Sequence, residues 1–465
     1  MKLVHLLAAC AVLTTGCTLG PNYKKPTIDT PAGQAASGYA VFTQQNWWTM
    51  FNDPVLNRME EEALKYNWDL QAAIARVDQA RADVTITGAD QFPSLSAAGS
   101  SGREGNASGS GESMSRAGLN VSFELDLWGK YRRMKEAARA QLLATETARD
   151  TVRLTLTADV AKQYFAMLML DDQIKIAQQT LKARQENVRV YQARYEAGYA
   201  TEVDLRRVQA NMSSVQAEEE QLRLNLAKTE TALSVLLGKS PRAIVEDPLA
   251  RGKTLNEETL VPNVPAGLPS DLLERRPDVM TAEQQLIAAN ADIGVARTAY
   301  FPSISLTAAA GYASNALTGL FGGNSGVWNL AGSVAAPLFE GGKIKAENKK
   351  AEAKYREVLA NYQKTVQLAF KEALDAINSN QIYRQMYDSY LSQTNDMRRS
   401  YDLTKKQEDA GLIGVTDLLS VEETLLSAEM NLATARNNEL DAVVDLVKAL
   451  GGGWTSGDIK NESVK

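Results

Sequence analysis

Few side chains in this sequence could carry out covalent or acid–base chemistry. The chain has two cysteines, Cys10 and Cys17, and one histidine, His5. If a leader is removed before Cys17, the mature chain has no free thiol, no disulfide and no imidazole. This excludes cysteine and histidine nucleophiles, the usual zinc sites and histidine acid–base catalysis. No nucleophile elbow, Walker motif or dinucleotide-binding glycine motif lies between a predicted strand and a predicted helix. We therefore expect no enzyme, no cofactor and no metal site.

The one covalent modification that the sequence favours is acylation of Cys17. Lys2, an apolar run over residues 3–13 and small residues before Cys17 form a secretory signal that is too short to span a membrane. A cysteine directly after Thr-Thr-Gly is typical of a bacterial lipoprotein signal, in which this cysteine becomes the lipidated, palmitate-bearing first residue. Cys10 follows Leu-Ala-Ala and fits that pattern letter for letter, but it leaves an apolar region of only about six residues. We expect residues 1–16 to be the signal peptide and Cys17 to carry the lipid.

Charge and hydropathy exclude two further classes of protein. The formal net charge is −6, so a nucleic-acid-binding role has no electrostatic support. After the signal no apolar run reaches eighteen residues, so no transmembrane helix is predicted, and any membrane crossing must use strands.

The chain contains an internal duplication. Short motifs of the first half return in the same order in the second half, first at an offset of 209 and then at an offset of 213. The matching pairs are Phe92-Pro93-Ser94 with Phe301-Pro302-Ser303, Ala197-Gly198 with Ala410-Gly411, Asp204-Leu205 with Asp417-Leu418, and Leu237-Gly238 with Leu450-Gly451. A repeat of this length indicates two copies of one supersecondary unit.

Each copy is predicted to contain a very long helix. The tracts 130–197 and 343–410 are free of proline, rich in helix-forming residues and 68 residues long, which corresponds to roughly 100 Å of helix. Gly198 and Gly411 are placed to end these helices. Shorter helices are predicted over 54–91, 201–238, 270–300 and 415–451.

Two strand pairs lie between the helices. From Leu119 to Leu127 large apolar residues alternate with polar ones, which predicts a strand with two unlike faces. The apolar face would be core in a sandwich and would face lipid in a transmembrane barrel. The stretches 99–111 and 311–326 are expected to be turns. Trp128 and Phe339 close the second strand of each pair, where aromatic girdle residues belong, although ordinary packing explains Trp128 equally well.

Four strands are too few to close a membrane barrel, which needs about eight. The chain must therefore form oligomers if its strands cross lipid. Two copies would supply eight strands and three copies would supply twelve.

These features together resemble the TolC-type family of outer-membrane efflux factors, in the lipoprotein (NodT) branch that serves resistance–nodulation–division (RND) efflux systems. The resemblance covers nearly the whole mature chain. Its local motifs are Cys17 to Pro26, Trp47-Trp48, Phe51-Asn52-Asp53-Pro54, Arg275-Arg276-Pro277-Asp278-Val279, Ile293 to Arg297, Phe301 to Ile304, Gly341-Gly342 and Ala449 to Trp454.

The resemblance implies an α+β membrane protein made of a tandem-duplicated helix-strand-strand-long helix-helix unit. It implies a homotrimer in the outer membrane, with one twelve-stranded β-barrel in lipid and an α-helical barrel in the periplasm. The expected partners are a periplasmic adaptor (membrane fusion) protein, an inner-membrane RND pump and outer-membrane lipid. The turns at Gly198 and Gly411 are expected to contact the adaptor.

The resemblance also implies a periplasmic gate at Asp204 and Asp417, which follow the turn glycines by six residues in the two copies. In a trimer these residues would place up to six carboxylates around the axis, a site that attracts cations. The alternative is helix capping, because Asp204 follows Thr201, and Asp417 follows Gly414, at capping-box spacing. The two roles do not exclude each other. Ile413 and Ser420 stand where the best-known relative has an arginine and a second aspartate, which weakens the match.

Arg275-Arg276-Pro277-Asp278 could bind a phosphate or an acidic ligand, but a solvated helix start with an early proline is the favoured interpretation. The expected domain boundaries are residues 1–16 for the signal, 17–53 for a lipid-anchored segment, 54–240 and 270–451 for the repeats, 241–269 for an equatorial linker and 452–465 for a tail. An outer-membrane channel explains these features together. A periplasmic coiled-coil scaffold or adaptor would leave the strands unexplained, and a carboxylate-based hydrolase explains almost nothing.

Overall fold

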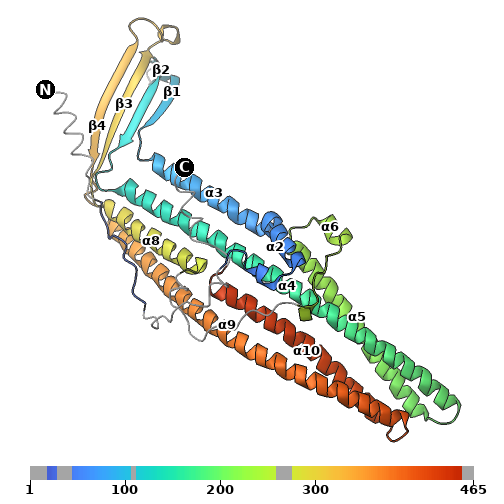
Figure 1. Cartoon of the computed structure of the whole chain (residues 1–465). Coiled ribbons are helices and arrows are strands. Elements are labelled where there is room, and N and C mark those ends of the chain that lie inside the picture. Colours follow the sequence, from blue (N-terminus) through green and yellow to red (C-terminus); the bar gives the residue numbers. More distant parts are fainter. Residues whose placement is uncertain (1–17, 29–43, 106–110, 258–274, 453–465) are drawn as a thin grey trace. The chain divides into compact units, whose positions relative to one another are not determined.

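A computed structural model of the chain describes residues 18–28, 44–105, 111–257 and 275–452. The first repeat contains α2 (Pro54–Tyr66), α3 (Trp68–Ala89), β1 (Ser94–Gly105), β2 (Gly111–Glu124), α4 (Lys130–Glu196) and α5 (Glu202–Leu236) (Figure 1). The second repeat contains α8 (Pro277–Thr298), β3 (Ser303–Ser314), β4 (Gly326–Ala335), α9 (Lys343–Asp409) and α10 (Val415–Ala449). Short helices η1 (Trp47–Phe51), α6 (Pro241–Glu246), η2 (Leu255–Glu257) and η3 (Leu317–Gly319) complete the description. The order of elements that the sequence predicted is therefore present twice.

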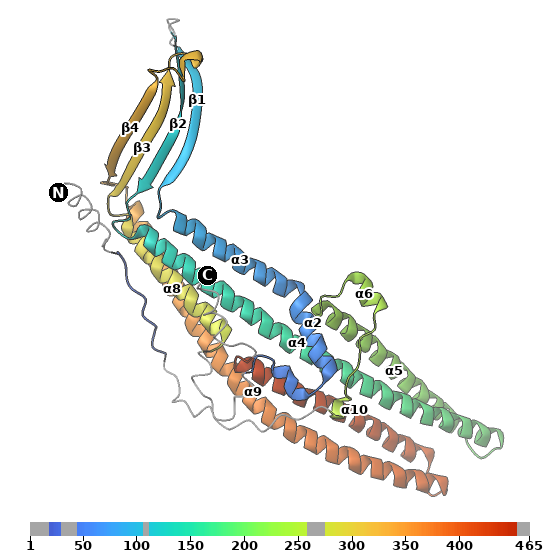
Figure 2. The same cartoon turned by 45° about the horizontal axis from the view of Figure 1, so that its top comes forward.

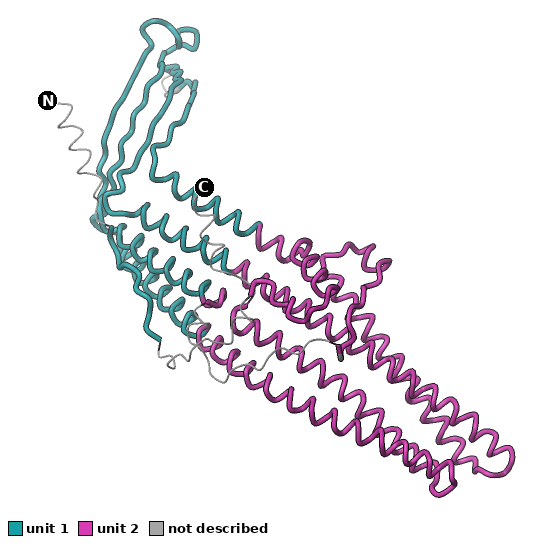
Figure 3. Tube along the Cα trace, viewed as in Figure 1, with its two compact units in different colours: residues 1–28, 75–147, 280–364 teal, residues 29–74, 148–279, 365–465 magenta. Residues whose placement is uncertain are grey.

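The residues group into two compact units (Figure 3). The first comprises residues 1–28, 75–147 and 280–364, and it contains the sheet. The second comprises residues 29–74, 148–279 and 365–465, and it contains the turns between the long and short helices. The expected signal at 1–16, Cys17 and all but Gly452 of the expected tail lie outside the described residues.

In the first unit the four strands form one antiparallel sheet in the order β1-β2-β3-β4 (Figure 2). The turns predicted over 99–111 and 311–326 are longer than the turns that the structure shows. β1 runs on to Gly105, β2 begins at Gly111, and β3 continues to Ser314. Every backbone amide and carbonyl needs a partner, and a strand pair supplies one whatever the side chain is, so glycine- and serine-rich sequence can still be strand. The tip residues 106–110 lie outside the described residues.

The N-terminal residues 18–28 are fastened to the first unit by polar contacts. The Leu19 amide donates to the Trp128 carbonyl at 3.1 Å, and Arg133 donates to the Leu19 carbonyl at 3.1 Å and to Asn22 Oδ1 at 2.8 Å. A Cβ added to Gly20 would lie 2.4 Å from Gly294 Cα, so these two backbones meet where no side chain fits. This contact gives a physical reason for the glycines of two of the family-like motifs.

The two long helices contain 67 residues each, and the two helices after them contain 35 each. Gly198 and Gly411, just beyond the long helices, have φ angles of +78° and +68°. Residues other than glycine rarely adopt this left-handed conformation, so these glycines end the helices as the sequence predicted. Among the described residues, no helix has both the length and the apolar character needed to cross a membrane.

The helix predicted over 54–91 is divided in two at Asn67. This residue is extended, its Oδ1 accepts from the Leu70 amide at 3.0 Å to cap α3, and its Nδ2 donates to the Leu236 carbonyl at 2.9 Å. A Cβ on Gly238 would overlap the Tyr66 carbonyl, so the end of α5 packs directly against this break. A tertiary contact far away in the sequence therefore overrides the local helix pattern.

The core of the second unit explains the Asp53-Pro54 part of the predicted motif. Pro54 opens α2, and Asp53 caps it by accepting from the Val55 amide at 2.7 Å. The same buried carboxylate accepts from the Tyr164 hydroxyl at 2.5 Å and from the Lys253 amide at 3.1 Å. Asp53 thereby joins α2, α4 and the segment before η2.

A largely buried carboxyl on α10, that of Asp441, makes the stability of the second unit depend on pH. Asp441 Oδ2 accepts from Asn437 Nδ2 at 3.0 Å, whereas its Oδ1 has no hydrogen-bond partner among the described residues. Burial raises the pKa of Asp441 to about 6, against about 3.9 in an unfolded chain. Ionisation is therefore harder in the folded state, and stability falls as the pH rises from about 4 to 6.

We expect Asp441→Asn to stabilise the protein at pH 7.5, by up to about 3 kcal/mol, and to have little effect at pH 4. The measurement is the melting temperature at both pH values. The control is Asp445→Asn one turn further on, because Asp445 is half exposed and pairs with Lys162 at 2.6 Å, so its loss should not stabilise. Equal gains at both pH values would contradict the ionisation of Asp441 as the cause.

Candidate functional site

The sheet has two chemically distinct faces. Residues paired across neighbouring strands point to the same side, so the three registers identify each face. The apolar face carries Leu95, Leu119, Val121, Phe123, Leu306, Trp328, Leu330 and Val334. The polar face carries Ser94, Ser96, Arg116, Asn120, Ser122, Glu124, Thr307, Asn329 and Ser333.

The apolar face is exposed rather than covered by a second layer. Leu330 is 73% exposed, and Leu95, Leu119 and Trp328 are exposed as well. Along β2 and its continuation, alternate residues from Ala117 to Leu125 are apolar over nine residues, which is the length of a strand that crosses a bilayer. This face fits lipid, and it does not fit the core of a sandwich.

The polar face is lined mainly by neutral hydroxyl and amide groups. Ser94 and Ser122 lie 2.7 Å apart across β1 and β2, and Ser305 and Ser333 lie 2.6 Å apart across β3 and β4, measured between their Oγ atoms. Such a surface satisfies its polar groups by itself and by water, as the wall of an aqueous channel requires.

Trp128 does not project as an isolated girdle residue. Its ring lies 4.8 Å from the Phe301 ring, and its Nε1 donates to the Pro302 carbonyl at 2.7 Å. It joins the end of the first strand pair to the start of the second. Phe339 is 91% exposed.

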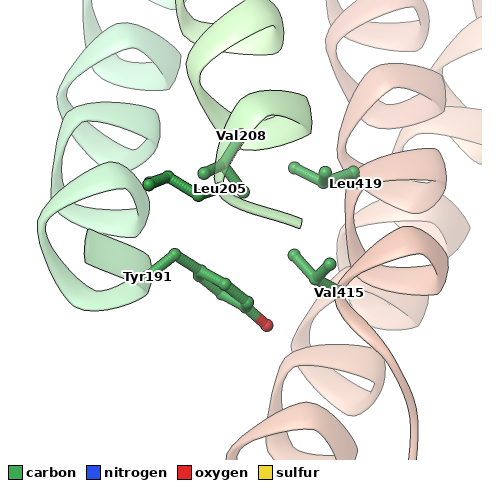
Figure 4. Close-up of a cluster of buried hydrophobic side chains, with 5 residues drawn as sticks. All are labelled: Tyr191, Leu205, Val208, Val415 and Leu419. Atoms are coloured by element: carbon green, nitrogen blue, oxygen red, sulfur yellow. The ribbon is translucent and has the colours of Figure 1, made fainter. Parts of the chain in front are cut away.

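In the second unit, the turn after α4 and the turn after α9 are joined by one apolar cluster (Figure 4). Figure 4 shows Tyr191 of α4, Leu205 and Val208 of α5, and Val415 and Leu419 of α10 pointing toward one another. The cluster places the first turns of α5 and α10 next to each other. The two predicted gate residues lie in these turns, next to Leu205 and between Val415 and Leu419.

The two predicted gate aspartates differ in their local contacts. Asp204 completes a capping box with Thr201, and the hydrogen bonds from Thr201 lower the pKa of its carboxyl. Asp417 is exposed, and the N-cap of α10, Gly414, receives no side-chain hydrogen bond. The capping interpretation is therefore right for Asp204 and wrong for Asp417, whose charge is open to solvent.

One cation near these aspartates, Arg207, was not predicted from the sequence. Arg207 Nη1 donates to Thr416 Oγ1 at 2.8 Å, next to Asp417, and Arg207 also contributes to lowering the pKa of Asp204. One helical turn separates Arg207 from Asp204, so this position on the same face was the available signal.

A second polar group ties α4 to α9. Arg194 Nη1 pairs with Glu408 Oε1 at 2.6 Å, and the Tyr191 hydroxyl donates to the same oxygen at 2.8 Å. Burial, together with the Glu408 carboxylate, raises the pKa of the Tyr191 hydroxyl, which stays protonated and continues to donate. This contact fixes the end of α4 to the end of α9.

The turn glycines Gly198 and Gly411 lie at open surface. A Cβ built on either one meets no atom within 4 Å, and the neighbouring Tyr199 and Leu412 are exposed. The turns therefore present apolar side chains to solvent.

The Arg275-Arg276 motif is not the solvated helix start that the sequence favoured. Arg275 is exposed, but Arg276 is only 6% exposed, and it pairs with Asp278 at 2.7 Å and Glu372 at 2.6 Å. Its Nη1 donates to the Ala449 carbonyl at 3.1 Å, at the end of α10. The guanidinium of Arg276 is thus engaged within the protein and is not free to bind a phosphate. Pro277 does open α8, as predicted.

Comparison with known proteins agrees with this architecture. The sequence pattern of the family described as "Outer membrane efflux protein" matches residues 60–239 and 268–452, one stretch in each repeat. The chain is 33% identical to the cation efflux system protein CusC of Escherichia coli O6:H1 over 468 residues, which cover 98% of this chain and 100% of the relative. It is also 33% identical to the solvent efflux pump outer membrane protein SrpC of Pseudomonas putida, over 98% of this chain and 99% of the relative.

Solved structures show the same fold. The Campylobacter jejuni CmeC outer membrane channel has a TM-score of 0.89 and 28% identity, with 96% of this chain and 98% of that chain covered. The open-state Neisseria gonorrhoeae MtrE outer membrane channel has a TM-score of 0.84 and 32% identity, with 94% and 98% covered. The duplicated fold, the two-faced sheet and these similarities agree, and the chain belongs to the outer membrane efflux protein family.

Proposed function

We propose that three copies of this chain form the outer-membrane exit channel of a tripartite efflux system. The observation that carries the proposal is the four-stranded sheet, with one face for lipid, one face for water and two free edges. Strand edges that stay unpaired are not tolerated in a bilayer, so the sheet must be completed by other copies. Three copies would supply the twelve strands that the family resemblance implies.

The remaining parts of the proposal concern partners and anchoring. The exposed turns at Gly198 and Gly411, with Tyr199 and Leu412, would contact a periplasmic adaptor that links the channel to an inner-membrane RND pump. Cys17 would carry the lipid. This assignment is supported by the hydrogen bond from the Leu19 amide to the Trp128 carbonyl, just after β2. It holds the residues that follow Cys17 close to the sheet that would lie in the membrane.

Two neighbouring residues of β2 test the assignment of the faces. Asn120 lies on the polar face and Val121 on the apolar face. We expect Asn120→Arg to leave assembly intact and to shift the ion selectivity of the channel in planar bilayers toward anions. We expect Val121→Arg to reduce the amount of assembled protein in the outer membrane, because an arginine that faces the middle of the bilayer costs about 2–4 kcal/mol.

The same experiment separates the channel from the alternative, a periplasmic scaffold or adaptor lipoprotein. A scaffold would not conduct, and it would tolerate both substitutions equally. Equal behaviour of the two variants, or no conductance from the wild-type protein, would overturn the channel proposal.

A further inference from the structure

The sheet ends in two free edges, and both carry exposed apolar side chains near their base. β1 and β4 are the outer strands in Figure 2, and each pairs with only one neighbour within the protomer. Leu338, just after β4, is 96% exposed, and Phe92, just before β1, is 68% exposed. Such groups are normally covered, and the proposed trimer brings β4 of one copy to β1 of the next.

Within the protomer, the contact between β2 and β3 resembles the contact expected between β4 of one copy and β1 of the next. β2 ends the strand pair of the first repeat, and β3 begins the strand pair of the second, so their contact joins one repeat unit to the next. They pair from Ser115 opposite Ser314 to Glu124 opposite Ser305, and the Leu125 amide donates to the Ile304 carbonyl at 2.8 Å. In a ring of six repeat units, the contact between β4 and β1 of the next copy is the same kind of junction.

The two hairpins define which residues are equivalent in the two repeats. The Phe-Pro-Ser motif relates β1 to β3 by 209 residues, so Ser94 corresponds to Ser303. Ser94 pairs with Ser122, and Ser303 pairs with Ala335, so β2 corresponds to β4 with an offset of 213 residues. Gly129 and Gly342 also differ by 213, and both have positive φ angles, +79° and +88°.

We propose that β4 pairs antiparallel with β1 of the next copy in the register of the β2–β3 junction. Ser122 lies opposite Thr307 in that junction, and the equivalent pair is Ala335 and Ala98 of the next copy. The whole ladder then joins residues 328–337 to residues 105–96 of the next copy. This register rests on the proposed trimeric channel, and it adds the identity of the surfaces that close it.

The proposed register matches the chemistry of both faces. On the polar face it sets Ser333 opposite Ser100 of the next copy, which repeats the cross-strand serine contacts between Ser94 and Ser122 and between Ser305 and Ser333. On the apolar face it sets Leu338 opposite Leu95 of the next copy, two exposed leucines that would cover each other.

Pro337 does not block this edge. The Ala313 amide donates to the Ser325 carbonyl at 2.8 Å, so odd-numbered residues of β4 direct their backbone groups toward β3. The amide hydrogen that proline lacks would therefore have pointed to the side of β3. Even-numbered residues such as Val334, Ala336 and Leu338 direct their amides to the free edge, where β1 of the next copy would accept them.

At the end of the junction nearest the helices, one aromatic contact of the β2–β3 junction has no equivalent residue. Trp128 covers Phe301 within the protomer. Gly341 is the counterpart of Trp128 at the offset of 213, so nothing equivalent covers Phe92 of the next copy. Phe339 lies two residues before Gly341 and is exposed, and we infer that its ring supplies this cover.

Engineered cysteines can test the register, because Cys10 and Cys17 are the only native cysteines. Ala98 and Ala335 would form a pair without mutual backbone hydrogen bonds, with Cα atoms about 4.5 Å apart, which suits a disulfide. We expect the double variant Ala98→Cys/Ala335→Cys to form covalent trimers on oxidation, at least ten-fold above either single variant and reversible by reductant.

The matched controls are Ser96→Cys/Ala335→Cys and Ser100→Cys/Ala335→Cys, on the same face but two residues out of register, at about 7–8 Å. More covalent product from either control than from the Ala98 pair would overturn the register. An intact trimer by light scattering with no covalent product from any pair would also overturn it, and the channel proposal would stand. A monodisperse monomer in every sample would overturn the trimer itself.

Discussion

Arg276→Met is expected to lower the free energy of unfolding by roughly 2–4 kcal/mol, because it removes a buried cation that joins three helices. The guanidinium pairs with Asp278 at the start of α8 and with Glu372 of α9, and it donates to the Ala449 carbonyl in the last turn of α10. Methionine keeps most of the apolar contact but leaves the carbonyl without this donor and removes the cation that favours the C-terminal end of α10. The partner carboxylates are partly exposed and can be hydrated, which keeps the loss below that of a fully buried pair.

The measurement is thermal unfolding of the detergent-extracted protein, followed by circular dichroism at one protein concentration. Arg275→Met is the matched control, because Arg275 is the preceding residue, carries the same charge and is exposed. We expect the control to change stability by less than about 0.5 kcal/mol. If the two variants have the same melting temperature, the contacts of Arg276 contribute no more to stability than an exposed charge does.

The long-range organisation of the fold could be predicted because it depends on simple patterns. A proline-free tract followed by a glycine predicts a helix and its end, and α4 and α9 end at Glu196 and Asp409, within two residues of Gly198 and Gly411. The alternation from Leu119 to Leu127 likewise predicts a two-faced strand. Both signals act locally, and duplication supplies each of them twice.

The features that were missed depend on partners far away in the sequence. Asn67 divides a helical pattern because its side chain bonds to Leu236. Arg276 is buried because Glu372 and Ala449 meet it, although its immediate neighbours resemble an ordinary helix start. The glycine- and serine-rich ends of β1 and β3 form strands because the neighbouring strand offers hydrogen bonds. None of these partners can be identified from the spacing of residues alone.

At the candidate gate, too, some residues could be predicted from the sequence and one could not. The family resemblance pointed to Asp204 and Asp417, which hold equivalent places in the two repeats, and residue spacing predicted the capping box at Thr201 and Asp204 that the structure shows. It did not identify Arg207, whose contact with Thr416 depends on the packing of α5 against α10. The region of the two predicted gate aspartates therefore contains charges of both signs.

Replacing Asp417 with alanine is expected to reduce the preference of the channel for cations several-fold, because its exposed carboxylate is not used in capping. Adding Asp204→Ala is expected to raise the conductance of the closed state, because each copy would then contribute neither carboxylate to the periplasmic mouth of the channel. Asp204→Ala also removes part of a capping box and should cost about 1 kcal/mol in stability, which Asp417→Ala should not.

Single-channel recordings in planar bilayers give the conductance and the reversal potential under a salt gradient. Glu202→Gln is the control: Glu202 lies in the same turn of α5 as Asp204, is exposed, and is paired with Arg206 at 3.3 Å. Its removal takes away one charge per protomer without touching the two aspartates. If that control changes selectivity as much as Asp417→Ala, the effect reflects the total charge of the tip. If the double variant conducts and selects as the wild type does, with its trimer intact, the aspartates do not gate the channel and only the capping role of Asp204 remains.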